Sequence, residues 1–475
     1  LEYKPRVKPK FASLEAAKPV DELTTRIKIF QAAPDKAGEF FRQLHALLFS
    51  YISHRIPEIS DELYRVDDAL KAGFGWEIGA FETWDLLGVN EMTVAIEKAG
   101  SSIAPWVHDM LKKGHTHFYK TENGKRLCFD PIAGTYKELP GGSNFLVMTQ
   151  HAKKEVWKNS ACKLFDLGDD VLGLQWNTKM GSIGAEVLAG IQTAVEKAEE
   201  QFQGLVIANE GANFSAGANV GMIFMLAIEQ EYDELNMAIR LFQQTMMRLR
   251  YSGIPVVVAP HGLTLGGGCE VNLHADKCCP TAETYTGLVE LGVGLIPGGG
   301  GTKEFVLRAG EEMHADEPET VTLKNRFMQI ATAKVGTSAH EAFAMGIYRK
   351  GVDEIVLNSK RRISVAKQAV INIQKTGYSK PIEKKAIPVL GKAGLGPLYA
   401  GIHAMKTAGY ATEHDALVAK KLAYVMCGGE LSEPTKVDEQ YLLDLEREAF
   451  LSLCGEKKTL ERIQSVLTTG RPIRN

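Results

Sequence analysis

The sequence predicts an α/β protein with more than one domain, and three observations support this fold class. The chain has 475 residues, which is long for a single hydrophobic core. Its N-terminal part carries apolar side chains at helical spacing, whereas from Ala161 short β-branched runs alternate with amphipathic segments. We therefore expect a helical domain at residues 1–113, a hairpin and linker at 114–160, and a mixed α/β domain at 161–475.

The composition is that of a globular protein and excludes several classes. Apolar residues make up 45% and charged residues 24% of the chain, and the formal net charge is −3. No block of lysine and arginine indicates a nucleic-acid surface, and no apolar run reaches the ~18 residues that a membrane span needs. The chain begins with Leu1 and not with Met, so we expect a fragment of a longer protein.

Cysteine usage indicates a reducing compartment. The seven cysteines are odd in number and irregularly spaced, which argues against a disulfide framework. Cys278 and Cys279 are adjacent but have no CxxC or HxxxH partner, so we interpret them as packed thiols. The N-terminus lacks the apolar core of a signal peptide, and we expect a cytoplasmic protein.

The N-terminal domain is predicted from helical periodicity and from its turns. A basic, proline-containing lead at residues 1–33 is interpreted as a linker. An apolar stripe then predicts a helix over residues 37–56, which Pro57 ends, and residues 91–106 also look helical. Polar and aromatic residues at 114–143, with Asn123-Gly124, predict a hairpin.

The second domain is predicted as strands and helices in alternation. Residues 163–167 and 171–176 are expected to pair as strands, and 204–208 and 255–259 are expected to be buried strands. A long helix is expected over residues 223–252. After residue 302 we expect helices at 303–308, 321–330 and 337–345, and a strand at 352–356.

The most informative stretch lies between residues 254 and 302. The strand at 255–259 feeds a turn with three consecutive glycines, 266–268, and Glu270 follows at the start of a helix predicted over 270–275. Glu290 stands in an apolar stretch and precedes a second glycine run, 298–301. Glycine runs allow a close approach of the backbone, and two carboxylates beside them form a candidate acid/base site with an oxyanion hole.

The strings IPVVVAPHGLTLGGGCE and ELGVGLIPGGGGT closely resemble the enoyl-CoA hydratase (crotonase) superfamily. The resemblance covers residues 161–475 except for a Gly/Pro-punctuated helical stretch at 377–437, which we interpret as an insertion. It implies an α/β fold in which a crotonase-like spiral of β-β-α units follows the N-terminal helical domain in the chain and ends in C-terminal helices. Proteins of this superfamily commonly form trimers, so a homo-oligomer is possible.

The resemblance also implies roles for individual residues. The N–H groups of Ala218 and Gly267 match the oxyanion hole, and Glu270 and Glu290 match the two glutamates of true hydratases. We assign water activation to Glu270 and proton donation to Glu290, although the pair titrates together and could share these roles. The remaining positions implied to bind substrate are Ala216, Gly217, Asn219, Gly266, Gly298 and Lys179.

Several of these residues have a structural alternative. Asn219 stands where the family usually has Asp, which could change its contacts to coenzyme A. Lys179 could instead be an ordinary surface lysine, and His274 and Asp276 are interpreted as structural. A group of methionines could line an acyl tunnel or pack in the core. These are Met222, Met225, Met237, Met246 and Met247.

The string GFGWEIGAFETWDLLGV, residues 73–89, resembles the helical C-terminal domain of 3-hydroxyacyl-CoA dehydrogenases. It is not a dinucleotide fingerprint, because its third glycine is displaced and no strand precedes it. In that family the nicotinamide-binding domain lies upstream, and no such domain is present here. The chain therefore resembles the C-terminal part of a fatty-acid β-oxidation multifunctional protein.

Together these resemblances imply an enoyl-CoA hydratase that adds water to trans-2-enoyl-CoA. The expected partner is an acyl-CoA thioester, and neither a metal ion nor NAD is expected to be bound by this chain. Two alternatives stay open: an enoyl-CoA isomerase, and a non-catalytic acyl-CoA-binding module. Acyl chain length, stereochemistry and the purpose of the insertion do not follow from the sequence.

Overall fold

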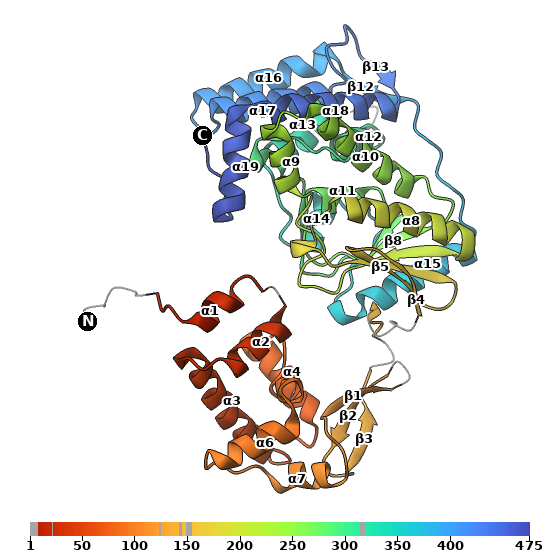
Figure 1. The fold of residues 1–475 in the computed structure, drawn as a ribbon. Helices are drawn as coiled ribbons and strands as arrows, with labels where there is room; N and C mark the ends of the chain where they lie inside the picture. The colour runs from red at the N-terminus through yellow and green to blue at the C-terminus, as the bar shows by residue number, and fades with distance from the viewer. Residues whose placement is uncertain (1–7, 21, 123–124, 142–144, 149–153, 314–318) are drawn as a thin grey trace. The chain divides into compact units, whose positions relative to one another are not determined.

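The computed structural model describes residues 8–20, 22–122, 125–141, 145–148, 154–313 and 319–475 (Figure 1). The chain divides into two compact units, residues 1–144 and 145–475. The start of the basic lead, residues 1–7, and the predicted Asn123-Gly124 turn lie outside the described residues. Within the described part of the chain, no helix combines the length and apolarity needed to cross a membrane.

The first unit is built from helices and one small sheet. Its helices are α1 (Ala12–Ala17), α2 (Leu23–Ala32), α3 (Lys36–His54), α4 (Leu63–Phe74), α5 (Ala80–Leu87), α6 (Val89–Lys98) and α7 (Pro105–Lys112). The predicted helix at 37–56 is α3. The prediction of a single helix over 91–106 was wrong, because α6 ends at Lys98 and Pro105 starts a new helix at its first position.

Two glycines in the 73–89 string explain how neighbouring helices meet. Gly75 caps α4 in the left-handed conformation, with φ of +67°, which glycine adopts without strain. Gly79 starts α5, and a Cβ atom there would collide with the side chain of Asp67 on α4. The core of this unit forms around stacked aromatic rings such as Phe49 and Trp84, whose centroids are 4.9 Å apart.

The segment predicted as hairpin and linker is divided between the two units. An antiparallel sheet, β1 (Tyr119–Glu122), β2 (Lys125–Asp130) and β3 (Thr135–Glu138), packs Phe118 and Phe129 into the core of the first unit. Strand β4 (Glu155–Lys158) instead pairs with β5 (Cys162–Asp166) in the second unit.

The second unit contains a six-stranded sheet with the order β10-β8-β7-β6-β5-β4. The predicted strands at 163–167, 171–176, 204–208 and 255–259 are all present in it. They are β5 (Cys162–Asp166), β6 (Val171–Trp176), β7 (Gly204–Ile207) and β8 (Val256–Val258), beside β10 (Lys277–Cys278). Strands β6, β7, β8 and β10 run parallel, whereas β4 and β5 pair antiparallel.

Helices cover both faces of this sheet. Leu205 and Ile207 of β7 face the core that contains α8 (Ala185–Gln201), whereas Val206 packs against α15 (Arg362–Thr376). This alternation explains the continuous apolar run of β7 and of β8, since both faces of a parallel sheet are buried. A second parallel pair, β9 (Gly262–Leu265) and β11 (Thr284–Gly287), leads into the glycine-rich turns.

The remaining helices complete the second unit (Figure 1). They are α9 (Val220–Ile228), α10 (Tyr232–Arg250), α11 (Gly267–Leu273), α12 (Gly301–Glu312), α13 (Glu319–Ala331), α14 (Ala339–Ala344), α16 (Lys392–Thr407), α17 (Glu413–Met426), α18 (Glu439–Cys454) and α19 (Lys457–Thr469). Short 3-10 turns are η3 (Lys179–Gly181), η4 (Glu290–Val293) and η5 (Ser359–Arg361), and strands β12 (Ile387–Val389) and β13 (Thr435–Val437) pair antiparallel.

Three predictions in this unit were wrong in detail. The helix predicted over 223–252 is two helices, α9 and α10, because Gln230 adopts φ of +60° between them. The helix predicted to begin at Glu270 begins at Gly267. The strand predicted at 352–356 forms only an isolated bridge between Val356 and Thr281.

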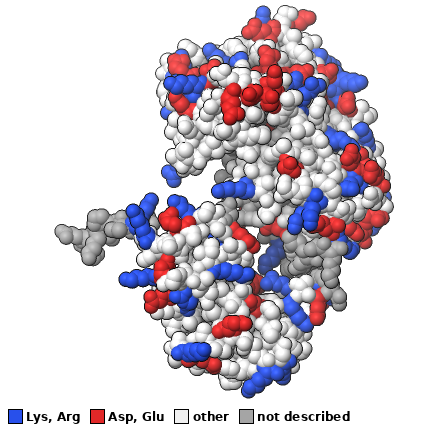
Figure 2. Space-filling view, in the orientation of Figure 1, with Lys and Arg blue, Asp and Glu red and all other residues white. Residues whose placement is uncertain are grey.

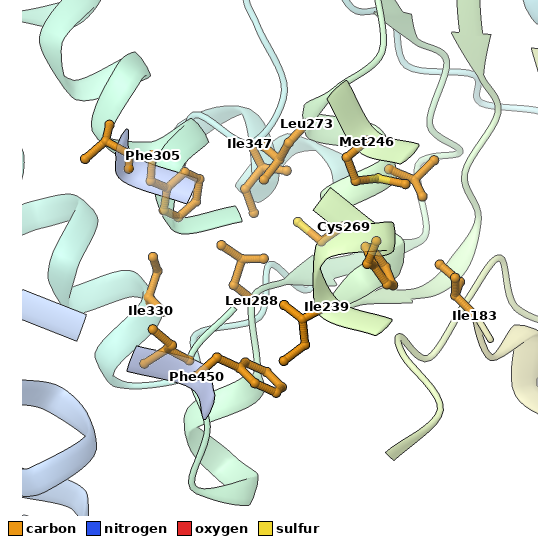
Figure 3. Close-up of a cluster of buried hydrophobic side chains, with 14 of the residues drawn as sticks. Ile183, Ile239, Met246, Cys269, Leu273, Leu288, Phe305, Ile330, Ile347 and Phe450 are labelled. Atoms are coloured by element: carbon orange, nitrogen blue, oxygen red, sulfur yellow. The ribbon is translucent and has the colours of Figure 1, made fainter. Parts of the chain in front are cut away.

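The main core of this unit lies between α10, α11, α12 and α18. Figure 3 shows side chains from these elements facing one another, among them Met246, Cys269 and Phe450. Met246 is therefore a core residue, whereas Met225 and Met237 are exposed. On the face drawn in Figure 2, basic and acidic side chains are intermingled, as the small net charge suggests.

Candidate active site

The three-glycine turn joins β9 to α11 and places Glu270 in the first turn of that helix. Gly266 has φ of +52° and ψ of −122°, a conformation that side chains other than hydrogen disfavour. A Cβ atom on Gly266 would lie 2.9 Å from Glu290 Oε1, so the turn also lies against the second predicted glutamate. The local sequence thus brings Glu290 to the start of α11.

The second glycine run is held by the carboxylate of Glu270. Its Oε1 accepts hydrogen bonds from the N–H groups of Gly299 and Gly301, both at 2.8 Å. A Cβ atom on Gly299 would collide with the ring of Phe242 and lie 2.7 Å from Glu270 Oε2. Glycine is therefore required where the loop passes over this carboxylate.

A third carboxylate, Glu446 on α18, holds the same loop from the other side, and sequence reasoning missed it. Its oxygens accept from the N–H groups of Gly300 at 2.7 Å and Thr302 at 2.9 Å. The two glutamates thus take alternate amides of one loop. Glu446 is fully buried, and Gln243 Nε2 donates to it at 3.3 Å.

Burial raises the pKa of all three carboxyls, and neighbouring charges raise the pKa of Glu270 and Glu290 further. Burial, followed by the charges of Glu290 and Glu446, raises the pKa of Glu270 well above its ordinary value, against the hydrogen bonds from the glycine loop. Burial raises the pKa of Glu290 to about 7, and the charge of Glu446 adds to this. Burial likewise raises the pKa of Glu446 to about 7. Near neutral pH this group of acids can hold and release protons.

Glu290 has an oxygen with no partner. It is the first residue of η4 and is partly exposed as a residue, but its Oε2 is enclosed and has no hydrogen-bond partner among the described residues. The second oxygen of Glu270, Oε2, likewise accepts no hydrogen bond within the described part of the chain. A buried acceptor without a partner is costly, so Oε2 of Glu290 is suited to an added molecule.

The two amides predicted as an oxyanion hole lie side by side. A Cβ atom on Gly217 would lie 3.3 Å from the nitrogen of Gly267, and one on Gly267 would lie 3.2 Å from the nitrogen of Ala218. Among the described residues, neither Ala218 nor Gly267 donates its N–H to a protein acceptor. Two free donors at adjacent turns can stabilise one developing negative charge.

The other predicted positions surround these amides. Ala216 donates its N–H to the carbonyl of Met180 at 2.9 Å, which fixes the turn containing Lys179 beside the 215–219 loop. Asn219 caps α9 by accepting from the Met222 N–H at 3.3 Å. Gly298 lies under the ring of Phe450, which a Cβ atom would approach to 2.9 Å. The structure therefore brings the predicted residues into one region of the second unit.

A buried network supports α11 from behind. His274 lies 2.7 Å from the carbonyl of Glu270 through Nδ1 and 3.2 Å from Lys303 Nζ through Nε2. Because a lysine ammonium only donates, Nε2 accepts and Nδ1–H donates to Glu270. Burial lowers the pKa of His274 to about 3, so the ring is neutral and structural, as predicted. Within the described residues, no group of three His, Cys, Asp or Glu side chains is arranged to hold a metal ion.

Comparison with known proteins shows which family this part of the chain resembles. Residues 171–376 match the family described as enoyl-CoA hydratase/isomerase. The whole chain is 40% identical over 477 residues to a probable 3-hydroxyacyl-CoA dehydrogenase of Bacillus subtilis (strain 168), covering 60% of that protein. It is 26% identical to a putative fatty acid oxidation complex trifunctional enzyme of Rickettsia felis, over 90% of this chain and 53% of that protein.

The chain thus spans about half to three-fifths of the length of these curated relatives. Solved structures are similar at a lower level. An enoyl-CoA hydratase from Bacillus halodurans gives a TM-score of 0.44 at 15% identity, covering 64% of this chain and 100% of that chain. An enoyl-CoA hydratase from Thermoplasma volcanium GSS1 gives 0.37 at 22% identity, covering 56% and 91%. Residues 171–376 thus match the enoyl-CoA hydratase/isomerase family, the crotonase superfamily.

Proposed function

We propose that the second unit hydrates trans-2-enoyl-CoA thioesters to 3-hydroxyacyl-CoA. The observation that carries this proposal is the buried Glu270 and the enclosed, unpartnered Oε2 of Glu290, beside two free backbone donors. Hydration needs a polarised carbonyl, a base for water and an acid for the α-carbon, and these groups meet all three needs. The family match supports chemistry on an enoyl-CoA substrate.

The reaction follows from these positions. The thioester oxygen accepts hydrogen bonds from the N–H groups of Ala218 and Gly267, which stabilise the negative charge that develops as water attacks. Glu270 takes a proton from the water while the water oxygen bonds to the β-carbon. Glu290 gives its proton to the α-carbon, so one water is added across the double bond in total. Since the two carboxyls feel each other's charge, they titrate as a pair and can share these roles.

These steps use only side chains and amides of this chain, so we propose that neither a metal ion nor NAD takes part in this reaction. A dehydrogenase activity would belong to a longer protein of the kind that this chain matches in part. All seven cysteines are free and buried, which supports a reducing, cytoplasmic location. Fatty-acid β-oxidation is the process that we infer from the substrate chemistry and from the names of the relatives.

The test is hydration of crotonyl-CoA, followed by the loss of the ultraviolet absorbance of the conjugated thioester. Glu270→Gln keeps the size of the side chain but cannot act as a base, and we expect kcat to fall by ~10²–10⁴-fold. The matched control is Glu283→Gln, which changes an exposed glutamate of the same region and should leave kcat within twofold. Full activity of Glu270→Gln would contradict the proposal.

The same experiment separates the two alternatives. An isomerase would give no hydrated product from crotonyl-CoA but would increase the absorbance of a 3-enoyl-CoA as its double bond moves into conjugation. A non-catalytic module would bind butyryl-CoA equally well after both glutamates are changed to glutamine, and would turn over neither substrate. Either result would replace hydration as the function of this unit.

A further inference from the structure

Gln243 on α10 is a buried polar residue that none of the reaction steps uses. It is 2% exposed, and its side-chain amide is fully hydrogen-bonded. Its Nε2 donates to the carbonyl of Leu443 at 2.9 Å and to Oε1 of Glu446 at 3.3 Å, and its Oε1 accepts from Nη1 of Arg447 at 3.1 Å. All three partners lie on α18, so this one amide joins α10 to the helix that carries Glu446.

The charges around this amide fix which of its ends faces Glu446. A guanidinium group only donates hydrogen bonds, and an ionised carboxylate only accepts them. The oxygen of the amide must therefore face Arg447, and its nitrogen must face Glu446. An ionised glutamate at position 243 could not donate to Glu446, and an apolar side chain could bond to neither neighbour. Both ends of a glutamine are therefore needed here.

The oxygen of Glu446 that Gln243 contacts also holds the glycine loop. Oε1 of Glu446 accepts from Gln243 and from the N–H group of Gly300, and Oε2 accepts from the N–H group of Thr302. A donor that is fixed on α10 thus sets where this oxygen lies beneath the loop. The alternate amides of the same loop, those of Gly299 and Gly301, are bound to Glu270 and have no contact with Gln243.

The other end of this set of contacts lies near solvent. Arg447 and Gln243 both line a polar pocket of about 560 Å³ between α10, α18 and residues 380–385. The side chain of Arg447 is 18% exposed and pairs with Asp444 at 2.7 Å. Arg447, Gln243, Glu446 and Gly300 therefore form one continuous series of hydrogen bonds from the surface to the loop.

We propose that Gln243 is a positioning residue that acts through Glu446, by holding this carboxylate ionised and in place beneath the glycine loop. This role rests on the proposed function, because it assigns Gln243 to the hydration site. The hydrogen bond from Gln243 favours the ionised form of Glu446, against burial, which raises the pKa of Glu446 to about 7. Burial also raises the pKa of Glu270 and Glu290, and the negative charge of Glu446 raises both further.

Groups from several elements surround the carboxyl of Glu446. The carboxyl of Glu270 faces it from α11, and that of Glu290 faces it from η4. From α12, the N–H groups of Thr302 and Lys303 donate to its Oε2 at 2.9 and 3.4 Å. Loss of the donor on α10 therefore changes the charge that acts on both candidate catalytic glutamates.

The first test is Gln243→Met, which keeps the length of the side chain but removes its donor and its acceptor. Without this donor, Glu446 keeps its proton to higher pH, so less negative charge acts on Glu290, which then loses its own proton at lower pH. For crotonyl-CoA we expect kcat to fall ~3–10-fold and the alkaline limb of kcat/KM to move down by ~0.5 pH unit. The matched control is Gln244→Met, an exposed neighbour on the same helix, which should change neither.

Two further variants show whether Gln243 acts through Glu446. In a Glu446→Gln background there is no charge to hold, so adding Gln243→Met should not move the alkaline limb again. Arg447→Met removes the cation that orients the amide and leaves Gln243 in place, and it should give a smaller shift in the same direction. Its matched control is Arg240→Met, an exposed arginine of the same pocket, which should give no shift. An unshifted limb in Gln243→Met, or an equal second shift in the double variant, would overturn the proposal.

A second readout does not depend on turnover. Hydrogen exchange of the N–H groups of Gly300 and Thr302, which Glu446 holds, should become ~10-fold faster in Gln243→Met. The N–H groups of Gly299 and Gly301, which Glu270 holds, serve as an internal reference and should stay within twofold.

The two readouts separate this proposal from the proposed function. If crotonyl-CoA is not hydrated but exchange rises selectively at Gly300 and Thr302, the proposed function fails and the link from Gln243 to the loop stands. If crotonyl-CoA is hydrated and Gln243→Met changes neither the alkaline limb nor the exchange of these two amides, the function stands and the positioning role of Gln243 is overturned.

Discussion

Both units of this protein bury carboxyl groups whose pKa is raised. In the first unit, burial raises the pKa of Asp67 to about 6 and that of Asp85 to about 7. In the second unit, burial raises the pKa of Glu290 and Glu446 to about 7 and that of Glu270 well above its ordinary value. By pKa alone, either unit would qualify as a candidate active site.

The two groups differ in what their oxygens contact. Both oxygens of Asp67 accept backbone N–H groups at the start of α5, at 2.8 and 3.1 Å. Both oxygens of Asp85 accept from Phe118 and Tyr119, at 2.6 and 2.8 Å. Glu290 Oε2, in contrast, is enclosed and has no partner among the described residues. Among these acids, an unpaired oxygen, and not a raised pKa, therefore distinguishes Glu290 from Asp67 and Asp85.

The largest expected effect comes from exchanging one acid in each unit for its amide. Glu290→Gln removes the proton donor, and we expect kcat for crotonyl-CoA to fall by ~10²–10⁴-fold. Its stability should stay equal or rise, because no backbone donor loses a partner at Oε2. Asp85→Asn should do the opposite: activity stays within twofold, and one buried N–H loses its acceptor at a cost of ~1–3 kcal/mol in the free energy of unfolding.

Hydration rates and thermal unfolding of the two variants measure this contrast directly. Loss of activity in Asp85→Asn, or a normal rate in Glu290→Gln, would show that the unpaired oxygen does not mark the reacting group.

A smaller effect is expected for Glu446, which contacts the glycine loop and not the free amides. We interpret it as a positioning residue whose charge also raises the pKa of Glu270 and Glu290. Glu446→Gln should lower kcat about tenfold, since loss of one preorganising interaction typically costs less than loss of the acid or base. It should also move the alkaline limb of the kcat/KM profile to lower pH.

Glu448→Gln is the matched control for Glu446, because Glu448 lies on the same helix and is exposed. It should change neither the rate nor the pH profile. A purely structural role of Glu446 would lower the rate and leave the position of the alkaline limb unchanged.

The pH dependence of the free energy of unfolding should also reflect the raised pKa of Glu290. A carboxyl whose pKa is higher in the folded state than in the unfolded state binds its proton more tightly when the protein is folded. Its contribution to stability is therefore present below the pKa of the unfolded state and is lost as the pH rises through the pKa of the folded state. For Glu290 this window runs from its ordinary pKa of 4.5 to about 7. Wild-type protein should therefore lose more stability between pH 5 and pH 8 than Glu290→Gln does. Calorimetric melting at both pH values tests this, and equal losses would contradict a raised pKa of Glu290.

The contrast between the units also explains what the sequence could predict. Gly267 and the two glutamates could be located because glycine runs and acids stand at short, recognisable separations between residues 254 and 302, whereas Ala218 was assigned through the family resemblance of the 216–218 loop. The strands of the main sheet were predictable for a similar reason, since β7 and β8 are apolar on both faces. Local patterns of residues carried both predictions.

Features that depend on distant contacts were not predictable. Glu446 follows Gly300 by nearly 150 positions, and nothing near it in α18 distinguishes it from the other acids of that helix. The break at Gln230 has no glycine or proline to announce it, and the start of α11 is set by how Gly266 turns beside Glu290. An apolar pocket of about 1180 Å³ lined by α13, α16 and α17 likewise exists only because these helices come together in space.

The smallest effect is expected in the first unit, where the acids serve the fold. A Cβ atom at Gly79 would collide with the side chain of Asp67, so Gly79→Ala should destabilise this unit by ~1–3 kcal/mol through overpacking. Gly73→Ala, in the same glycine-rich string, meets nothing within 4 Å and lies inside α4. It should instead stabilise the unit by ~0.5–1 kcal/mol, because alanine loses less backbone entropy in a helix. Urea unfolding measures both changes, and the rate of crotonyl-CoA hydration should stay the same in both variants. A hydration rate that changed together with the free energy of unfolding would mean that the acids of the first unit take part in catalysis.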